Sequence, residues 1–479
     1  MEYMTPSTLR HALSGSQDAA SLTARAAGRG GTPVRDGRTS ISPLAGRVLA
    51  RPSTSLAPRI VILGGGFAGV TTAMELAKRC VGVLPVHITL ISEQNYFLFT
   101  PMLAEAATGA VETRHVLYPI RPLCRAWEIE FGEMSIESID LARRRVIARH
   151  RRSPFRQQVH YDKLVLALGA TPNMTMVPGA AEHTFPFKGV GDAVLIRNHV
   201  IDLFEAAALI DDPWARQRLL TFVIVGAGHA GTELVAALEE LTRGILVRHY
   251  PSIPPDAVRL VLVGKAVLPQ TATNLAAYTK EQLLERGIQL ETVRAARVTA
   301  EGLELQDGRF IPSHCVIWTA GNRVSPVIDD LPLIKVKDGR LQVNEFFEVE
   351  GTPDVYALGD NAAQIDLHTG VPYVATAQVA VPQAKALAAV IEAELTGRPK
   401  HPFRFKVLGE MVPLSRRTAV ADFLGIKLAG FLAWFGWKVV YMLKLPTLAA
   451  RFRVVLDWTI ELFFERDVSE LSVARGRGD

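Results

Sequence analysis

The chain contains a short β-branched run that ends in closely spaced glycines and passes directly into a helix-forming run. Arg59–Leu63 is the apolar run, Gly64, Gly66 and Gly69 are the glycines, and Val70–Lys78 is the helix-forming run. The first glycine permits a tight turn, the second permits close approach of a pyrophosphate, and the third lets the helix pack on the strand. The helix N-terminus then offers free N–H groups to the phosphates. The motif predicts an α/β fold with a dinucleotide-binding (Rossmann-like) unit, and a glycine turn without nucleotide is the alternative.

The same motif occurs a second time. Thr221–Val225 leads into Gly226, Gly228 and Gly231, and a helix is expected over Thr232–Leu241. Two such units in one chain indicate two nucleotides held face to face. A flavin, FAD, and a nicotinamide nucleotide are the natural pair, because a flavin accepts hydride and passes electrons on while the protein supplies position and electrostatics.

Later runs return the chain to the first nucleotide. An apolar run, His87–Ile91, leads to Glu93, which lies where an acid binds a ribose hydroxyl. A buried strand ends near Gly169, and another ends in Gly359-Asp360. Asp360 is expected to hydrogen-bond the ribityl or phosphate end of the flavin. The second unit is therefore expected to be inserted in the first.

The second strand of the second unit, Arg259–Val263, ends in Gly264-Lys265 and not in an acid. An acid there would grip the 2′-hydroxyl of NADH and repel the phosphate of NADPH. Lys265 either attracts that phosphate or is an ordinary surface lysine. The choice between NADH and NADPH is open.

The last segments differ in character. Asp422–Leu445 is rich in aromatic residues and lysines, and its longest apolar stretch, Leu428–Trp437, is too short to span a bilayer. Arg451–Glu465 has apolar residues at helical spacing. Amphipathic helices of this composition suit a membrane surface, and a helical lid or a dimer interface are the alternatives. Upstream, Pro382 is awkward inside a helix, so the helix near it is expected to begin at about Val381.

Composition limits the remaining possibilities. The chain has 479 residues and a net charge of +5, an ordinary balance that does not indicate nucleic acid. Cys80, Cys124 and Cys315 are far apart, which argues against a dithiol flavoenzyme and fits a reducing cytoplasmic setting. The sequence has no metal-ligand cluster. Residues 1–58 are predicted to be a disordered extension, and an organellar transit peptide is the alternative.

Together the motifs resemble the type II NADH:quinone oxidoreductases, which are single-subunit NADH dehydrogenases that pump no protons. The resemblance runs from Arg59 to the C-terminus. It rests on the two glycine motifs, on Tyr96–Pro101, Tyr161–Gly169 and Ala357–Asp360, and on Lys444–Pro446 followed by Arg451–Asp467. It implies the following organisation: 59–184 and 326–400 form the FAD domain, 185–325 the NAD(P)H domain, and 401–479 a membrane-association region.

The resemblance also implies roles for individual residues. Glu233 would lie beside the nicotinamide, and Gln378 and Gln383 would lie near the flavin and the quinone head, although Pro382 stands where the family's later glutamine falls in one common spacing. The FAD contacts would be Gly64, Gly66, Phe67, Ala68, Gly69, Glu93, Gly169, Asp360 and Ala377, and the NAD(P)H contacts Gly226, Gly228, Gly231, Lys265 and Gly321.

The implied reaction is hydride transfer from NADH to flavin N5, followed by two-electron reduction of a membrane quinone. We expect a homodimer that binds peripherally to a membrane, and the absence of an export signal favours the cytoplasmic face of the inner (plasma) membrane. A sulfide:quinone oxidoreductase is the nearest rival and needs a pair of redox cysteines by the flavin. A flavin-binding interaction protein with low turnover is the second rival.

Overall fold

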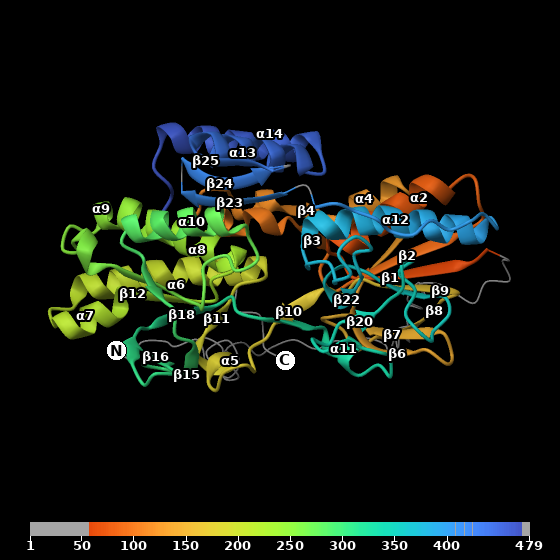
Figure 1. The fold of residues 1–479 in the computed structure, drawn as a ribbon, viewed down its shortest axis with the longest axis horizontal. Coiled ribbons are helices and arrows are strands. Elements are labelled where there is room, and N and C mark those ends of the chain that lie inside the picture. Colours follow the sequence, from red (N-terminus) through yellow and green to blue (C-terminus); the bar gives the residue numbers. More distant parts are fainter. Residues whose placement is uncertain (1–56, 408, 416, 424, 472–479) are drawn as a thin grey trace, which may run out of the picture.

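The computed structural model describes residues 57–407, 409–415, 417–423 and 425–471. The predicted disordered extension lies outside these residues, apart from 57 and 58. Two parallel sheets stand side by side, and a layer of sheet and helices lies above them (Figure 1).

The first sheet has the strand order β21-β9-β1-β2-β5, with every neighbouring pair parallel. Its strands are apolar and buried because helices cover one face and a small antiparallel sheet, β6-β7-β8, covers the other. The strands are β1 (Arg59–Leu63), β2 (His87–Ser92), β5 (Glu130–Glu133), β9 (Lys163–Leu166) and β21 (Val355–Ala357), covered by α2 (Phe67–Cys80), α12 (Ala377–Leu395), β6 (Ser135–Asp140), β7 (Arg145–Arg149) and β8 (Arg156–His160).

The second sheet has the order β11-β18-β12-β13-β14 and is also parallel. Its elements are β11 (Phe185–Pro186), β12 (Thr221–Val225), β13 (Arg259–Val263), β14 (Gln289–Glu291), β18 (Cys315–Trp318), α6 (Val190–Leu209), α8 (His229–Glu239) and α10 (Thr273–Glu285). The chain enters and leaves this unit through β10 (Ala170–Pro172) and β19 (Asn322–Val324), which pair antiparallel. The α/β class expected from the glycine motifs is confirmed.

Two helices start earlier than predicted. Helix α2 begins at Phe67 and α8 at His229, each directly after the second glycine of its motif. The expectation that a helix begins at about Val381 is wrong, because α12 begins at Ala377 and Pro382 lies inside it. The proline removes one donor from the helical ladder. Packing of α12 along α2 stabilises the helix across that gap.

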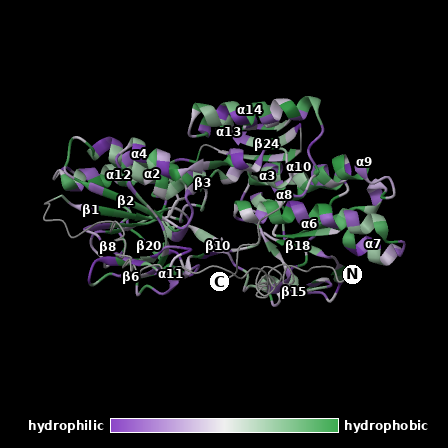
Figure 2. Cartoon of the chain, turned by 180° about the vertical axis from the view of Figure 1, so that it is seen from behind, coloured by the Kyte–Doolittle hydropathy of each residue, from purple (hydrophilic) through white to green (hydrophobic). Residues whose placement is uncertain are grey.

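The C-terminal region contains a sheet that the sequence patterns did not indicate. Its strands, β23 (Gly409–Ser415), β24 (Thr418–Phe423) and β25 (Ile426–Gly430), are antiparallel and precede α13 (Phe431–Lys444) and α14 (Leu448–Phe463). The aromatic segment predicted over Asp422–Leu445 therefore divides at Gly430, whose φ is +75°. Hydrophilic and hydrophobic residues alternate along α14 in Figure 2, as an amphipathic helix requires. Within the described residues, none of the helices is both long and apolar enough to cross a bilayer.

Candidate nucleotide and electron-transfer site

The first glycine turn is closely packed at two glycines and leaves the backbone open at another. Gly64 has a φ of +117°, and a Cβ there would lie 2.1 Å from the carbonyl oxygen of Ala167. A Cβ on Gly69 would lie 1.9 Å from the carbonyl oxygen of Gly64, so the helix packs directly on the turn. Gly66 is different, because no heavy atom lies within 4 Å of its Cβ position. The turn is closed where protein packs and open at the glycine expected to face a pyrophosphate.

Glu93 lies next to this turn. The backbone N–H of Gly64 donates to the carbonyl of Ile91 at 2.8 Å, which ties the turn to the end of β2. Glu93 follows two residues later and is exposed. The position expected for a ribose-binding acid is therefore beside the glycine turn and open to a ligand.

The Gly359-Asp360 turn follows β21 and meets the first glycine turn at the carboxyl edge of the sheet. A Cβ on Gly359 would lie 3.1 Å from the Cβ of Ala68, so the two turns are in close contact. The carboxylate of Asp360 lies 3.4 Å from the Lys188 amine. The amide oxygen of Gln383, whose side chain is buried, accepts a hydrogen bond of 3.0 Å from the Gly359 N–H. Gln383 therefore holds the turn that carries Asp360.

Asn361 fixes a third part of the site, and the sequence motifs did not single it out. Its buried side chain accepts a hydrogen bond from the Gly169 N–H and donates one to the Leu166 carbonyl, each at 3.0 Å. The exit of β9 and the Gly-Asp turn are thereby joined. Its position directly after the Gly359-Asp360 pair was the one sequence signal that could have pointed to this role. Ala377 and Gln378 lie in the first turn of α12, partly exposed.

The second glycine turn repeats the geometry of the first. Gly226 has a φ of +118°, and a Cβ there would lie 2.5 Å from the hydroxyl of Thr319. That hydroxyl lies 2.9 Å from the Gly226 carbonyl, to which it donates. A Cβ on Gly231 would lie 1.8 Å from the same carbonyl, whereas Gly228 has no heavy atom within 4 Å of its Cβ position. In both turns, therefore, the first and third glycines are closely packed and the second glycine faces open space.

Gly264 packs against this second turn. A Cβ on Gly264 would lie 2.6 Å from the Cβ of Ala227 and 3.0 Å from its backbone nitrogen. The side chain of an acid at position 264 would therefore clash with Ala227 unless the second glycine turn moved. Lys265, the next residue, is exposed.

Gly321 lies where the two domains join. Its φ is +70°, and a Cβ there would lie 2.3 Å from the sulfur of Met176. Its carbonyl accepts a hydrogen bond of 3.1 Å from the Asn173 N–H. Gly321 therefore belongs to the connection formed by β10 and β19.

Glu233 is the acid of α8 with the most perturbed environment. Burial raises the pKa of its carboxyl to about 8, His229 opposes this shift, and Glu105 adds to it. Burial alone would lower the pKa of His229, yet the Glu410 carboxylate, 3.5 Å from its Nε2, together with Glu233 raises it. The charged surroundings of Glu233 therefore involve His229 of α8 and, through His229, Glu410 of β23.

A buried ion pair lies close to Glu233. The Glu105 carboxylate is 3.5 Å from the Lys438 amine, and both side chains are largely buried. Burial raises the pKa of Glu105, whereas Lys438 opposes the rise. The amine also lies 4.1 Å from the ring centre of Trp458 on α14. The C-terminal helices therefore reach the same region as the acid of α8.

Aromatic rings connect the first glycine turn with the C-terminal helices. The ring centre of Phe67, at the start of α2, is 5.8 Å from that of Phe99. Phe99 is 6.1 Å from Tyr441 of α13, and Tyr441 is 4.9 Å from Trp437. A continuous row of aromatic rings therefore connects the first glycine turn with α13.

The cysteines form no redox pair. All three are free and buried. Cys80 and Cys124 belong to the core of the first sheet, and Cys315 belongs to the core of the second. Burial raises the pKa of Cys124 to about 11 and raises that of Cys315 further, so both thiols are poor nucleophiles. No group of three metal-ligating side chains occurs among the described residues.

Two dinucleotide turns in two adjoining parallel sheets define a pyridine nucleotide-linked oxidoreductase. Residues 58–384 match the pyridine nucleotide-disulphide oxidoreductase family model, and the chain belongs to that family. Residues 409–467 match the NDH2 C-terminal domain. Within the larger family, the chain belongs to the type II NADH:quinone oxidoreductases, as the sequence motifs predicted.

Named relatives agree with this placement. The chain is 30% identical over 423 residues to the type II NADH:quinone oxidoreductase Ndh of Mycobacterium tuberculosis, covering 85% of this chain and 89% of that one. It is 32% identical over 414 residues to the demethylphylloquinone reductase NdbB of Synechocystis, covering 85% and 96%. NDH2 of Plasmodium falciparum in complex with NADH shares the fold with a TM-score of 0.79 at 20% identity, covering 86% and 99%. The family implies a flavin and a pyridine nucleotide, and the comparisons favour the NADH:quinone reading over the sulfide:quinone rival.

Proposed function

We propose that the chain oxidises NADH and reduces a membrane quinone by two electrons, with FAD as its resident cofactor and without proton pumping. The observation that carries this proposal is the pair of glycine turns with matching open positions, Gly66 and Gly228. They occur in a chain whose C-terminal part matches the NDH2 C-terminal domain. Bound FAD would accept hydride from NADH and donate electrons to quinone.

The residues of the first domain fit FAD. Gly66 leaves room for the pyrophosphate at the N-terminus of α2, where no side chain caps the helix. Glu93 would bind the adenosine ribose, and Asp360 would bind the ribityl or phosphate end. The contact between Ala68 and Gly359 holds the first glycine turn and the Gly359-Asp360 turn in fixed positions relative to each other.

The second domain would hold the nicotinamide nucleotide through Gly228 and the start of α8. Since Ala227 excludes an acid at position 264, no carboxylate there repels a 2′-phosphate. We therefore include NADPH as a second donor, with exposed Lys265 as its phosphate contact. Glu233 would orient the nicotinamide or tune the charge beside it. Its pKa of about 8 means that its carboxyl holds a proton at neutral pH.

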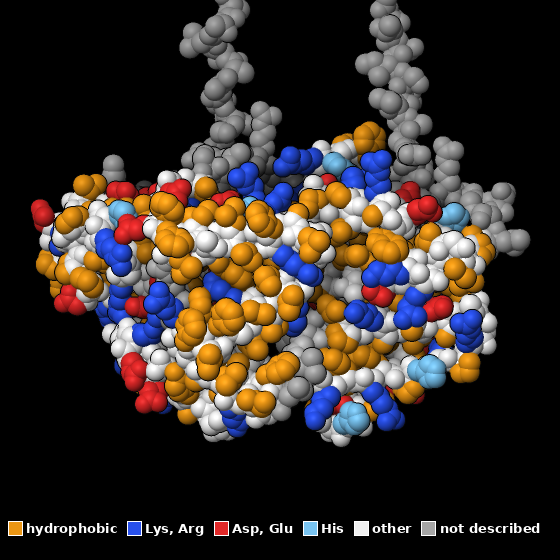
Figure 3. All heavy atoms as spheres, turned by 90° about the horizontal axis from the view of Figure 1, so that it is seen from above, with side chains coloured by type: hydrophobic (Ala, Val, Ile, Leu, Met, Phe, Trp, Pro, Cys, Tyr) orange, Lys and Arg blue, Asp and Glu red, His pale blue; other side chains and the backbone are white. Residues whose placement is uncertain are grey.

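The C-terminal helices would seat the enzyme on a membrane surface. Hydrophobic side chains gather over these helices, with Lys and Arg among them (Figure 3). The exposed members include Leu432, Phe435, Leu448, Phe452 and Phe463. Exposed apolar patches of this kind mark interaction sites, and apolar faces flanked by cations suit a bilayer interface. Homodimer formation and binding at the cytoplasmic face stay predictions from the sequence.

The test is anaerobic stopped-flow absorbance of the flavin-loaded protein, mixed in parallel with NADH and NADPH and then with a soluble quinone. We expect NADH to bleach the flavin band rapidly and quinone to restore it. Absence of bleaching by either nucleotide would refute the proposal, and bleaching by sulfide instead would revive the rival. Flavin bleaching without steady-state turnover on any quinone would favour the interaction protein.

A further inference from the structure

A hollow opens between the FAD domain and the first turns of α14. It is lined by β4 (Leu117–Pro119), by α4 (Ile120–Ala126), by the residues just before β4 and by α14. We call this hollow the Arg453 pocket. Its polar lining side chains are Arg114, His115, Tyr118, Thr447 and Arg453. None of these residues belongs to the nucleotide sites described above.

Positive charge dominates the Arg453 pocket. Arg453 is exposed and has no carboxylate partner within 4.0 Å among the described residues. Among the residues that the structure describes, Arg114 pairs with Glu112 alone, at 3.4 Å, and its side chain is 87% exposed. An exposed pair of this kind is weak, so its guanidinium stays available to a stronger anion. Two guanidiniums facing one hollow suit a phosphate, which accepts their hydrogen bonds in a fork geometry.

The walls of the pocket are held in place. The His115 ring nitrogen Nδ1 lies 2.6 Å from the Asp457 carboxylate, which also accepts a hydrogen bond of 3.2 Å from the Glu112 N–H. The Tyr118 hydroxyl donates to the His115 carbonyl at 2.9 Å. These contacts fix α14 on the FAD domain, so the pocket is formed before any ligand arrives.

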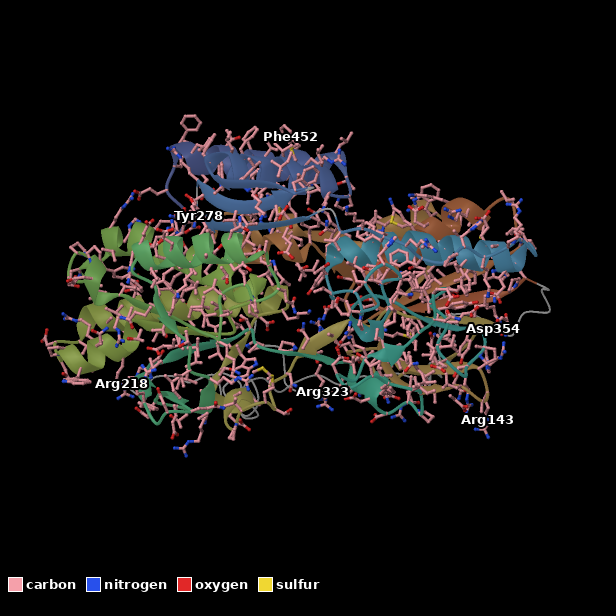
Figure 4. All side chains as sticks on the ribbon, viewed as in Figure 1. Arg143, Arg218, Tyr278, Arg323, Asp354 and Phe452 are labelled. Atoms are coloured by element: carbon pink, nitrogen blue, oxygen red, sulfur yellow. The ribbon has the colours of Figure 1, made fainter. Side chains whose placement is uncertain are left out.

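The position of Arg453 on its helix connects the pocket with the apolar surface. Ala450, Arg453 and Asp457 share one side of α14 because they are three and four residues apart. Leu448 and Phe452, which are 78% and 71% exposed, project elsewhere. Figure 4 shows Phe452 on the outer side of α14, away from the two sheets. A molecule with a phosphate and long apolar chains would satisfy both surfaces at once.

We propose that the Arg453 pocket binds the phosphate of an anionic glycerophospholipid. The phosphate contacts Arg453 and Arg114, and the acyl chains lie along the exposed side of α14. This inference rests on the proposed membrane seating and adds a specific lipid site to it. The lipid would fix the depth and rotation of α14 at the surface, which apolar contact alone does not define.

The test is co-sedimentation of the full flavin-loaded protein with vesicles of phosphatidylcholine, alone or mixed with phosphatidylglycerol, at constant ionic strength. Arg453→Gln and Arg114→Gln are compared with Lys427→Gln, which removes an exposed cation of the C-terminal region outside the pocket. We expect Arg453→Gln to lower the preference for phosphatidylglycerol about tenfold or more, as loss of a charge-assisted contact does. Lys427→Gln should lower it by at most about fivefold, the effect of one charge near an anionic surface.

The outcomes separate the two proposals. Equal losses for Arg453→Gln and Lys427→Gln, or no preference for phosphatidylglycerol in the unaltered protein, overturn the lipid site but leave membrane seating intact. No binding to either vesicle refutes the membrane seating itself. Displacement from mixed vesicles by inorganic phosphate, but not by chloride at the same ionic strength, would assign the pocket to free phosphate instead. Turnover with a soluble quinone should be unchanged in Arg453→Gln, which confirms that the variant is folded.

Discussion

The side-chain amide of Gln383 accepts a hydrogen bond of 3.0 Å from the backbone N–H of Gly359, beside the first parallel sheet. Gln383 is only 2% exposed, whereas Gly359 is partly exposed, so the bond is partly buried. Gly359 precedes Asp360 and touches Ala68 at the first glycine turn. Gln383 thus positions the turns proposed to bind the flavin, and the quinone contact expected from its sequence position stays a prediction.

The first prediction concerns this bond. Gln383→Ala should weaken retention of FAD about tenfold, because a partly buried N–H that loses its acceptor costs about 1 kcal/mol, near the low end of the penalty for a buried group. The KM for a soluble quinone should change by less than about twofold in enzyme saturated with FAD. Flavin release measured by fluorescence, together with quinone kinetics, checks both. Lys385→Ala, an exposed change on the same helix, is the control. A raised quinone KM with normal flavin retention would return Gln383 to the quinone site.

A second prediction follows from the contact between Gly264 and Ala227. Gly264→Glu should lower stability by roughly 1–3 kcal/mol, because its Cβ overpacks the turn at 2.6 Å. Ala227→Gly combined with Gly264→Glu should recover part of that loss and favour NADH over NADPH by about tenfold more than the unaltered protein. Thermal unfolding and the ratio of kcat/KM values measure these effects. An unchanged melting temperature for Gly264→Glu alone contradicts the packing argument.

The sequence predicted the parts of the site that depend on local chain geometry. A glycine needed for a positive φ, as at Gly64 and Gly226, leaves a readable pattern because few other residues tolerate that conformation. The amphipathic segment at Arg451–Glu465 likewise matches α14, since helical period is a local property.

Features that depend on partners distant in sequence could not be read in this way. Asn361 acts on Gly169, and Ala227 acts on Gly264, across gaps that no local pattern spans. The sheet β23-β24-β25 was hidden because Ile426–Gly430 runs into the aromatic helix, so the segment appeared as one apolar stretch. Pro382 misplaced the start of α12 because packing against α2 overrides a local penalty.

A third prediction concerns the pH dependence of stability and arises from Glu233. Its pKa is about 8 when folded and near 4.5 when exposed, so the folded protein binds the extra proton. As pH rises above about 4.5 the unfolded chain ionises first, and the free energy of unfolding falls until pH reaches about 8. Glu233→Gln removes this titration. The stability of the variant relative to the unaltered protein should therefore increase across that interval and level off above it, as measured by urea unfolding at several pH values. A difference that stays constant with pH would exclude the raised pKa.

The same carboxyl gives a fourth prediction for the reaction. Glu233→Gln should slow flavin reduction by NADH about tenfold or more if the carboxyl orients the nicotinamide. The remaining rate should lose any inflection near pH 8, because glutamine keeps the shape of the side chain without its proton. Anaerobic stopped-flow at several pH values measures both. An unchanged rate of flavin reduction would discard the role in orienting the nicotinamide.

The last prediction concerns the buried pair of Glu105 and Lys438. Lys438→Met should lower the free energy of unfolding by roughly 3 kcal/mol, because it leaves the buried Glu105 carboxyl without its cation. Adding Glu105→Gln should recover most of that loss, since the amide carries no charge to desolvate. Lys444→Met is the matched control: Lys444 lies on the same helix over the ring of Tyr441, at 5.5 Å, and its loss should cost less than about 1 kcal/mol. Urea unfolding of the four variants, in the absence of vesicles, measures the coupling. Additive losses in Lys438→Met and Glu105→Gln would mean that the two groups do not interact, and that this ion pair does not help to hold α13 in place.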